Sequence, residues 1–207
     1  METKQERGVR CPHCGRVQKI TRWRLINRET EPLAGLRAKK GTLFTVPCEA
    51  CGADMRLSYD CMVFDPAHRA MVYLCPEDHA PDNQTLSALP PEPGYKLRLV
   101  HTAAELSEKL DIFDSGLEDT VVELVKVFYY AQFQAQKPEE TVTDVVFAAA
   151  PAPCFRFTCQ SGRTYELPLQ NDYYKKVQAQ YQERIWQRTG AGMLRVDAAW
   201  AGGVLEL

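Results

Sequence analysis

Four cysteines at two matching spacings are the residues of this chain that point most directly to chemistry. The pattern Cys-x-x-Cys-Gly occurs twice, once near residue 11 and again near residue 48. Two residues between paired cysteines let one tight turn direct both sulfurs at the same ion, and Zn²⁺ is commonly held by four such thiolates at tetrahedral corners. The sequence therefore predicts a Zn²⁺ site whose ligands are Cys11, Cys14, Cys48 and Cys51.

The predicted site is of the structural type. A glycine after each cysteine pair permits the left-handed backbone that brings amide N–H groups toward the thiolates. Four cysteine ligands leave no position for a water or a substrate, so we expect the zinc to hold structure and the chain to be non-enzymatic.

A redox function is an alternative interpretation of the first pair. Cys11-Pro-His-Cys14 is also an active-site motif of disulfide oxidants, in which a thiolate of low pKa exchanges with disulfides. The second cysteine pair favours metal binding, because it supplies the two missing ligands. A thiol–disulfide redox protein that uses Cys11 and Cys14 is thus kept as a hypothesis.

Composition indicates an ordinary globular protein. Of the 207 residues, 45% are apolar and 25% are charged, which is typical of a folded chain. The first residues lack the apolar stretch of a secretory signal, and no run approaches the ~18 apolar residues of a membrane span. We expect a cytoplasmic protein with no membrane contact. The four remaining cysteines lie in apolar or strand-like stretches and are expected to be free thiols that behave as small hydrophobes: Cys61, Cys75, Cys154 and Cys159.

Positive charge is concentrated in the first part of the chain. Residues 1–41 carry eleven Lys and Arg against four Glu, although the whole chain has a net charge of −2. A basic segment of this kind predicts a nucleic-acid surface as one alternative, formed by Arg22, Arg24, Lys39 and Lys40. The competing interpretation is that these charges pair with the acidic residues that follow.

The pattern of the first half predicts mostly β structure. Strand-like segments at residues 19–26 and 42–46 are expected to form the two arms of a hairpin, with a short helix over residues 31–40 between them. Residues 55–59, 62–65 and 70–75 predict a β-meander with a turn at Asp65 and Pro66. Residues 81–94 are rich in proline and predict a linker.

The second half predicts a small mixed sheet packed with two to three helices. A strand is expected at 95–100, helices at 103–112 and 116–136, strands at 142–149, 154–159 and 164–169, and a helix at 172–188 capped by Asn171. Residues from 190 onward give no clear pattern. The expected fold is therefore α+β, with an elaborated zinc-ribbon-like module at 1–80, the linker at 81–94 and an α+β region at 95–207.

Several segments together resemble the CpXC domain family. They are CPHCG, CEACG, SYDCMVFDP followed by MVYLCP, and EKLDIFDSGLEDTVVELVK, and the resemblance covers residues 9–130. The family has no assigned biochemical activity. The resemblance implies a cysteine metal site and an architecture, and it carries no catalytic residues.

A run of acids near residue 115 is explained by helix capping. Carboxylates in the first turn of a helix interact favourably with its free N–H groups and dipole. The run therefore predicts helix starts in preference to a catalytic site, and it comprises Asp111, Asp114, Glu118, Asp119 and Glu123.

The expected function is a non-catalytic interaction or regulatory module with an unknown protein partner. Three features favour it: the closed metal site, the lack of a recognisable catalytic constellation, and tyrosines expected to be exposed on the last helix. Nucleic-acid binding and thiol–disulfide exchange are the two alternatives.

Overall fold

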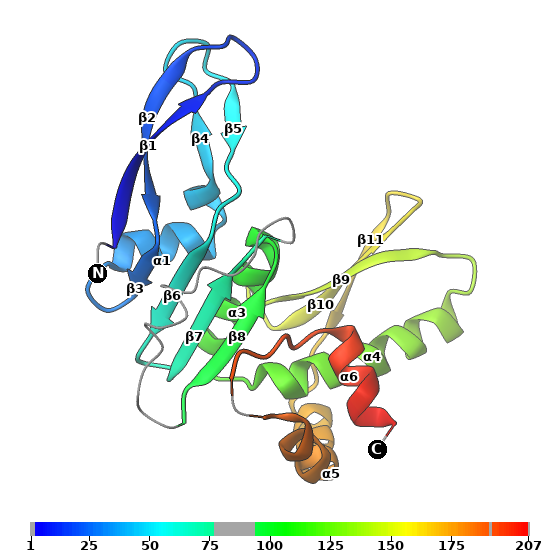
Figure 1. Ribbon diagram of the computed structural model, residues 1–207. Coiled ribbons are helices and arrows are strands. Elements are labelled where there is room, and N and C mark those ends of the chain that lie inside the picture. Colours follow the sequence, from blue (N-terminus) through cyan, green and yellow to red (C-terminus); the bar gives the residue numbers. More distant parts are fainter. Residues whose placement is uncertain (1–2, 77–93, 191, 207) are drawn as a thin grey trace. The chain divides into compact units, whose positions relative to one another are not determined.

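The computed structural model describes residues 3–76, 94–190 and 192–206, and it is a mixture of helices and small sheets (Figure 1). The chain divides into two compact units, Met1–Ser107 and Glu108–Leu207. Most of the predicted linker, residues 81–93, lies outside the described residues. The two units are described separately below.

Two β-hairpins form one end of the first unit. β1 (Lys4–Arg10) pairs antiparallel with β2 (Val17–Trp23), and β4 (Thr45–Pro47) pairs antiparallel with β5 (Asp54–Arg56). Each cysteine pair lies in the turn of one hairpin. The prediction that residues 19–26 and 42–46 pair with each other is wrong. β1 is the partner of β2, and Thr42–Phe44 forms a 3-10 turn, η1.

A four-stranded mixed sheet forms the core of the first unit. Its order is β3 (Leu25–Asn27), β6 (Cys61–Asp65), β7 (Ala70–Leu74) and β8 (Lys96–Val100). β6 and β7 are antiparallel, whereas the two outer pairings are parallel. All five residues of β7 are buried, as expected for a central strand covered on both faces.

This pairing differs from the predicted meander. Residues 54–56 belong to a separate hairpin, so only β6 and β7 of the three predicted strands are neighbours. β8 follows the predicted linker in sequence and pairs with β7. Residues 95–100 therefore belong to the sheet of the first unit. A mixed sheet was expected in the second half of the chain, but the mixed sheet belongs to the first unit, and the sheet of the second unit is antiparallel.

Two helices flank these strands in sequence. α1 (Pro32–Lys39) follows β3 and begins with proline, whose fixed φ suits the first helical position. α3 (Ala103–Asp114) follows β8 and continues across the division between the units. Thr102 starts α3, because its hydroxyl accepts from the Glu105 backbone N–H at 3.1 Å.

The second unit is built on α4 (Asp119–Gln136) and an antiparallel sheet of β9 (Val142–Ala148), β10 (Cys154–Cys159) and β11 (Thr164–Pro168). Aromatic rings join helix and sheet. Phe133 stacks on Phe157 with ring centroids 4.7 Å apart, and Tyr129 meets Phe155 edge-on at 4.9 Å. These contacts bury one face of α4.

Two further helices complete this unit, α5 (Asn171–Arg188) and α6 (Ala198–Leu205). The N-cap of α5 is Gln170, so the prediction of an Asn171 cap is wrong. α6 was not predicted. Its N-cap Asp197 accepts from the Trp200 backbone N–H at 2.9 Å, and Trp200 and Val204 are buried. None of the described helices has the length and apolarity needed to cross a membrane.

Candidate metal centre

The first cysteine pair lies in the turn between β1 and β2, which we call the first knuckle (residues 11–15). The backbone N–H of Cys11 donates to Arg16 O at 2.8 Å, and the N–H of Gly15 donates to Cys11 O at 3.0 Å. These bonds close a tight turn whose last residue, Gly15, has a φ of 73°. A residue with a Cβ is strained at that angle, which accounts for the glycine.

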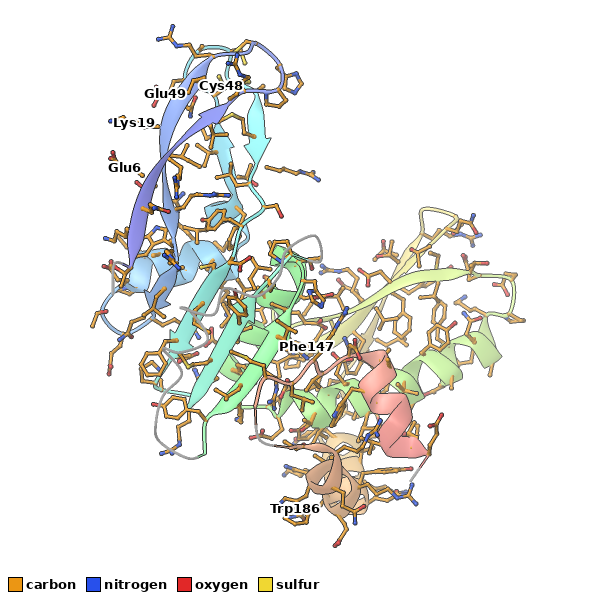
Figure 2. The ribbon with its side chains drawn as sticks, in the orientation of Figure 1. Glu6, Lys19, Cys48, Glu49, Phe147 and Trp186 are labelled. Atoms are coloured by element: carbon orange, nitrogen blue, oxygen red, sulfur yellow. The ribbon has the colours of Figure 1, made fainter. Side chains whose placement is uncertain are left out.

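The second knuckle (residues 48–52) repeats this turn between β4 and β5. The N–H of Cys48 donates to Ala53 O at 2.9 Å, and the N–H of Gly52 donates to Cys48 O at 2.8 Å, with φ of 72° at Gly52. Cys48 lies near the tip of this hairpin (Figure 2). The two cysteine pairs are therefore presented by two turns of the same construction.

The structure brings the four sulfurs together. All four Sγ atoms of Cys11, Cys14, Cys48 and Cys51 lie within 4.8 Å of one another. Across the knuckles, Cys11 Sγ is 3.8 Å from Cys51 Sγ, and Cys14 Sγ is 3.6 Å from Cys48 Sγ. A tetrahedron with metal–sulfur bonds of about 2.3 Å has edges of about 3.8 Å, so the observed separations fit a shared ion.

No disulfide joins any of the eight cysteines, all of which are among the described residues. A disulfide needs sulfurs about 2.0 Å apart, much closer than the cross-knuckle pairs. Cys61, Cys75, Cys154 and Cys159 are free, as expected, and all four are buried. Burial raises the pKa of the Cys61 thiol, which keeps it protonated and unreactive near neutral pH.

The first cysteine of each knuckle is buried and the second is exposed. Cys11 and Cys48 are 1% and 2% exposed and pack with Met55, while Val9 and Val46 cover the same cluster. Each knuckle thus faces apolar side chains on one side and solvent on the other. An ion between the four sulfurs would therefore be held from within the hairpins and be reachable from outside.

Backbone N–H groups and neighbouring sulfurs both lower the pKa of Cys48, whereas at Cys51 they act in opposite directions. N–H groups of Cys51 and Ala50 lower the pKa of Cys48 to about 6. At Cys51 the backbone of Ala53 acts in the same direction, but the other sulfurs, Cys14 first, and burial outweigh it and raise the pKa to about 12. Four thiolates so close together repel one another, and a divalent cation relieves that repulsion.

One residue at this site was missed by sequence reasoning. Gln18, on β2, is 7% exposed. Its side-chain amide forms hydrogen bonds with the backbone of Pro47 and of Glu49, the residues on either side of Cys48. The available signal was its position: Gln18 shares a strand face with the buried Ile20, where a polar side chain needs a partner.

Two basic residues of β2 are engaged with other groups of the first unit. The Arg22 guanidinium lies 4.7 Å from the centre of the Tyr59 ring and donates to Ser58 O at 3.2 Å. Lys19 pairs with Glu6 at 3.8 Å on the exposed face of the first hairpin. Of the four residues predicted to contact nucleic acid, Arg22 is therefore packed on an aromatic ring, whereas Lys40 at the end of α1 is exposed.

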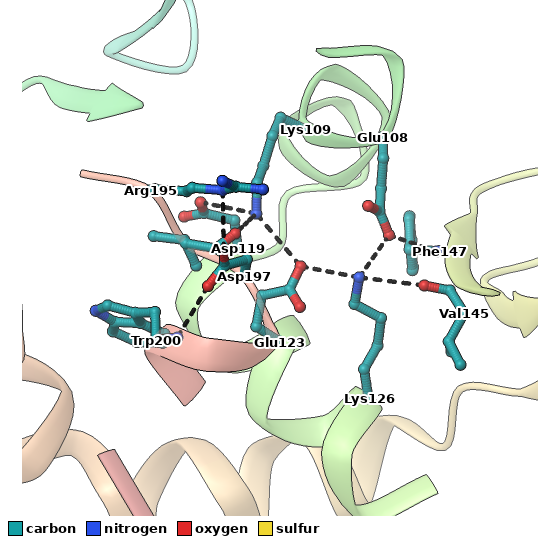
Figure 3. A network of polar contacts seen from close by, with 11 residues as sticks. Glu108, Lys109, Asp119, Glu123, Lys126, Val145, Phe147, Arg195, Asp197 and Trp200 are labelled. Carbon is teal, nitrogen blue, oxygen red and sulfur yellow. Dashed lines mark hydrogen bonds and ion pairs between the residues drawn. The ribbon is translucent and has the colours of Figure 1, made fainter. Parts of the chain in front are cut away.

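Asp119 lies in the first turn of α4, as the capping explanation requires, whereas Glu123 lies beyond that turn, and neither is a solvent-exposed cap. Asp119 and Glu123 are 0% and 4% exposed, and both pair with Lys109, at 3.5 and 3.4 Å (Figure 3). Glu118 is the N-cap of α4, but no side-chain hydrogen bond caps the helix. Asp119 and Glu123 are thus members of a buried ion-pair network in the second unit.

The tyrosines of α5 are packed within the second unit, which corrects the expectation that they are exposed. Tyr173 and Tyr181 contact Phe128, with ring centroids 6.4 and 5.7 Å away. Tyr174 is buried, and its hydroxyl accepts from the Glu118 backbone N–H at 2.9 Å. The exposed aromatic residue of this helix is Trp186, at 76%.

Comparison with known proteins gives one match. A search of curated proteins and a search of solved structures each returned nothing similar. The family model described as CpXC protein matches residues 9–126, which is more than half of the chain and includes both knuckles. The chain therefore belongs to the CpXC family.

Proposed function

We propose that this protein binds one Zn²⁺ through Cys11, Cys14, Cys48 and Cys51, and that the ion stabilises a zinc-ribbon-like module. The observation that carries the proposal is the meeting of four sulfurs from two distant turns within 4.8 Å. Tetrahedral sets of four thiolates are typical of zinc or of iron–sulfur centres. Two Cys-x-x-Cys knuckles on β-hairpins favour zinc.

The proposed role of the ion is structural. Four protein ligands complete the coordination of Zn²⁺, so a bound water or substrate would have to displace a cysteine. Hairpins as short as β4 and β5, each three residues long, are marginal alone. An ion that links them to the β1–β2 hairpin would contribute on the order of 10 kcal/mol to the order of this end of the unit.

For the chain as a whole we propose a non-catalytic interaction or regulatory module with a protein partner. The closed ligand set supports a non-catalytic role. The exposed indole of Trp186 supports protein contact, because tryptophan is enriched among the residues that dominate binding energies. The stacking of Arg22 on Tyr59 weighs against the nucleic-acid alternative, and the second cysteine pair weighs against the redox alternative.

Metal content of cysteine variants tests the zinc proposal. Cys48→Ser should lose zinc, whereas Cys61→Ser, which alters a buried thiol in β6, should retain it. Equal zinc in both variants would contradict the assigned ligands.

Affinity purification tests the proposed interaction. The unaltered chain should retain a protein partner from its host, and Trp186→Ser should weaken that retention. Recovery of nucleic acid in place of protein, with binding that falls as salt rises, would favour the alternative.

A further inference from the structure

The side chain of Gln18 is placed between the two hairpins that carry the cysteines. It extends from β2 of the first hairpin and is more than nine-tenths buried. Its contacts are with the second hairpin, at the residues immediately before and after Cys48. Burying a side-chain amide is costly unless its groups are hydrogen-bonded, so these contacts stabilise this position of the side chain.

Two hydrogen bonds fix this side chain. Gln18 Nε2 donates to the carbonyl oxygen of Pro47 at 3.1 Å, and Gln18 Oε1 accepts from the backbone N–H of Glu49 at 2.9 Å. A carbonyl only accepts and an N–H only donates, which determines the orientation of the amide. One planar group therefore holds the backbone on both sides of Cys48, whose neighbour Glu49 is seen in Figure 2.

We propose that Gln18 is a positioning residue for Cys48. By holding Pro47 and Glu49, it aims the Cys48 sulfur at the centre of the cluster and joins the two hairpins before an ion arrives. This inference rests on the proposed zinc site and adds a residue to it. Groups that orient metal ligands typically change metal affinity by about 10- to 100-fold when they are removed.

Substitution separates positioning from simple filling of space. Gln18→Met keeps the length and most of the volume of the side chain but removes both hydrogen bonds. Gln18→Glu keeps an acceptor for the Glu49 N–H, loses the donor to Pro47, and adds negative charge beside the thiolates. A residue that only fills space would be replaced well by methionine, whereas a positioning residue would not.

The experiment measures Zn²⁺ affinity by competition with a chromogenic chelator, and the absorption bands of Co²⁺ bound in place of zinc. We expect Gln18→Met to bind zinc about 10- to 100-fold more weakly than the unaltered chain. Its Co²⁺ bands should shift or lose intensity, because one thiolate is misaligned. Gln18→Glu should bind no more tightly than Gln18→Met.

The matched control is Gln5→Met on the paired strand β1. Gln5 accepts from Arg7 Nε at 3.1 Å on the exposed surface, so its loss should leave zinc affinity and the Co²⁺ bands unchanged. If Gln18→Met matches Gln5→Met in both measurements, Gln18 has no positioning role even though the zinc site stands. If the unaltered chain binds no zinc, the proposed function itself fails.

A measurement on the unaltered chain covers the case in which the Gln18 variants do not fold. Glu49 is exposed and lies in a turn, where an unbonded amide exchanges rapidly with solvent. The bond to Gln18 should slow the exchange of the Glu49 N–H in the zinc-loaded protein by at least tenfold relative to a free peptide. Exchange at the free-peptide rate would overturn the inference.

Discussion

Replacing Lys126 by methionine should destabilise the second unit strongly. Lys126 Nζ lies 2.9 Å from Glu123 Oε1 and 3.0 Å from Glu108 Oε1 (Figure 3). Glu123 and Glu108 are 4% and 8% exposed, and Glu108 also accepts from the Phe147 N–H at 2.6 Å. Methionine matches the aliphatic part of lysine, so the main change is the loss of the cation between two buried carboxylates.

The expected loss in unfolding free energy is about 3 kcal/mol. Removing one partner of a buried ion pair typically costs about 3–5 kcal/mol, because the remaining charge is left uncompensated. Two features place the value at the lower end. Lys109 still pairs with Glu123 at 3.4 Å, and burial already raises the pKa of Glu123, so that carboxylate can take up a proton more easily.

Native-state hydrogen exchange of peptides from α4 measures this loss within the second unit alone. A change of about 3 kcal/mol corresponds to a fall in protection of roughly 150-fold. The matched control is Arg156→Met, which breaks an exposed pair between Arg156 and Glu166 at 2.8 Å and should cost less than about 1 kcal/mol. Equal losses of protection in the two variants would refute the buried-charge reasoning.

Two further predictions concern the turns and the acid sensitivity. Gly52→Ala should cost about 1–2 kcal/mol, because φ is 72° there. Gly202→Ala is the comparison: this glycine lies within α6 with open space around it, so alanine should stabilise the protein by up to about 1 kcal/mol. Thermal unfolding measures both variants, and equal effects would contradict the φ argument. Bonds from Ser161 and Tyr165 lower the pKa of Glu140. The ionised Glu140 side chain should therefore contribute to folding stability above the pKa of about 4.3 that it has in the unfolded chain, and this stability should be lost as the pH falls below that value. Glu140→Gln should flatten the loss of stability between about pH 5 and 3, and an unchanged profile would count against this assignment.

Local patterns were enough to predict much of the second unit. β10 was predicted with its observed limits, residues 154–159, and α4 and α5 were predicted close to theirs. In these segments the apolar residues recur with the period of the element, so the signal is contained in the segment itself. α6 was missed because glycines interrupt a short apolar stretch and weaken its helical pattern.

Strand pairing in the first unit could not be predicted in the same way. β1 carries mostly exposed residues and lacks an apolar alternation, so nothing in its sequence marks it as the partner of β2. The pairing of β7 with β8 joins segments on either side of residues 77–93, and such long-range contacts leave no local pattern. The error in the predicted hairpin follows from the first of these facts, and the error in the predicted meander includes the second.

The meeting of the four cysteines was predicted better than the strand pairing around them. Cysteine spacing is set by the geometry of the turn that holds an ion, so the two pairs could be recognised without knowing which strands carry them. The groups that surround a site leave a weaker signal. Gln18 contacts the backbone beside Cys48 from a different hairpin, and the buried Asp119 and Glu123 pair with Lys109 and Lys126, which no local pattern indicates.

The most direct test of the proposed metal site is the zinc content and thiol reactivity of the same purified sample. One zinc per chain is expected. A strong chelator should make four thiols reactive together, those of Cys11, Cys14, Cys48 and Cys51, while the second unit stays folded. A sample that holds no metal, keeps its hairpins folded and shows the two exposed thiols, Cys14 and Cys51, as freely reactive would contradict the account.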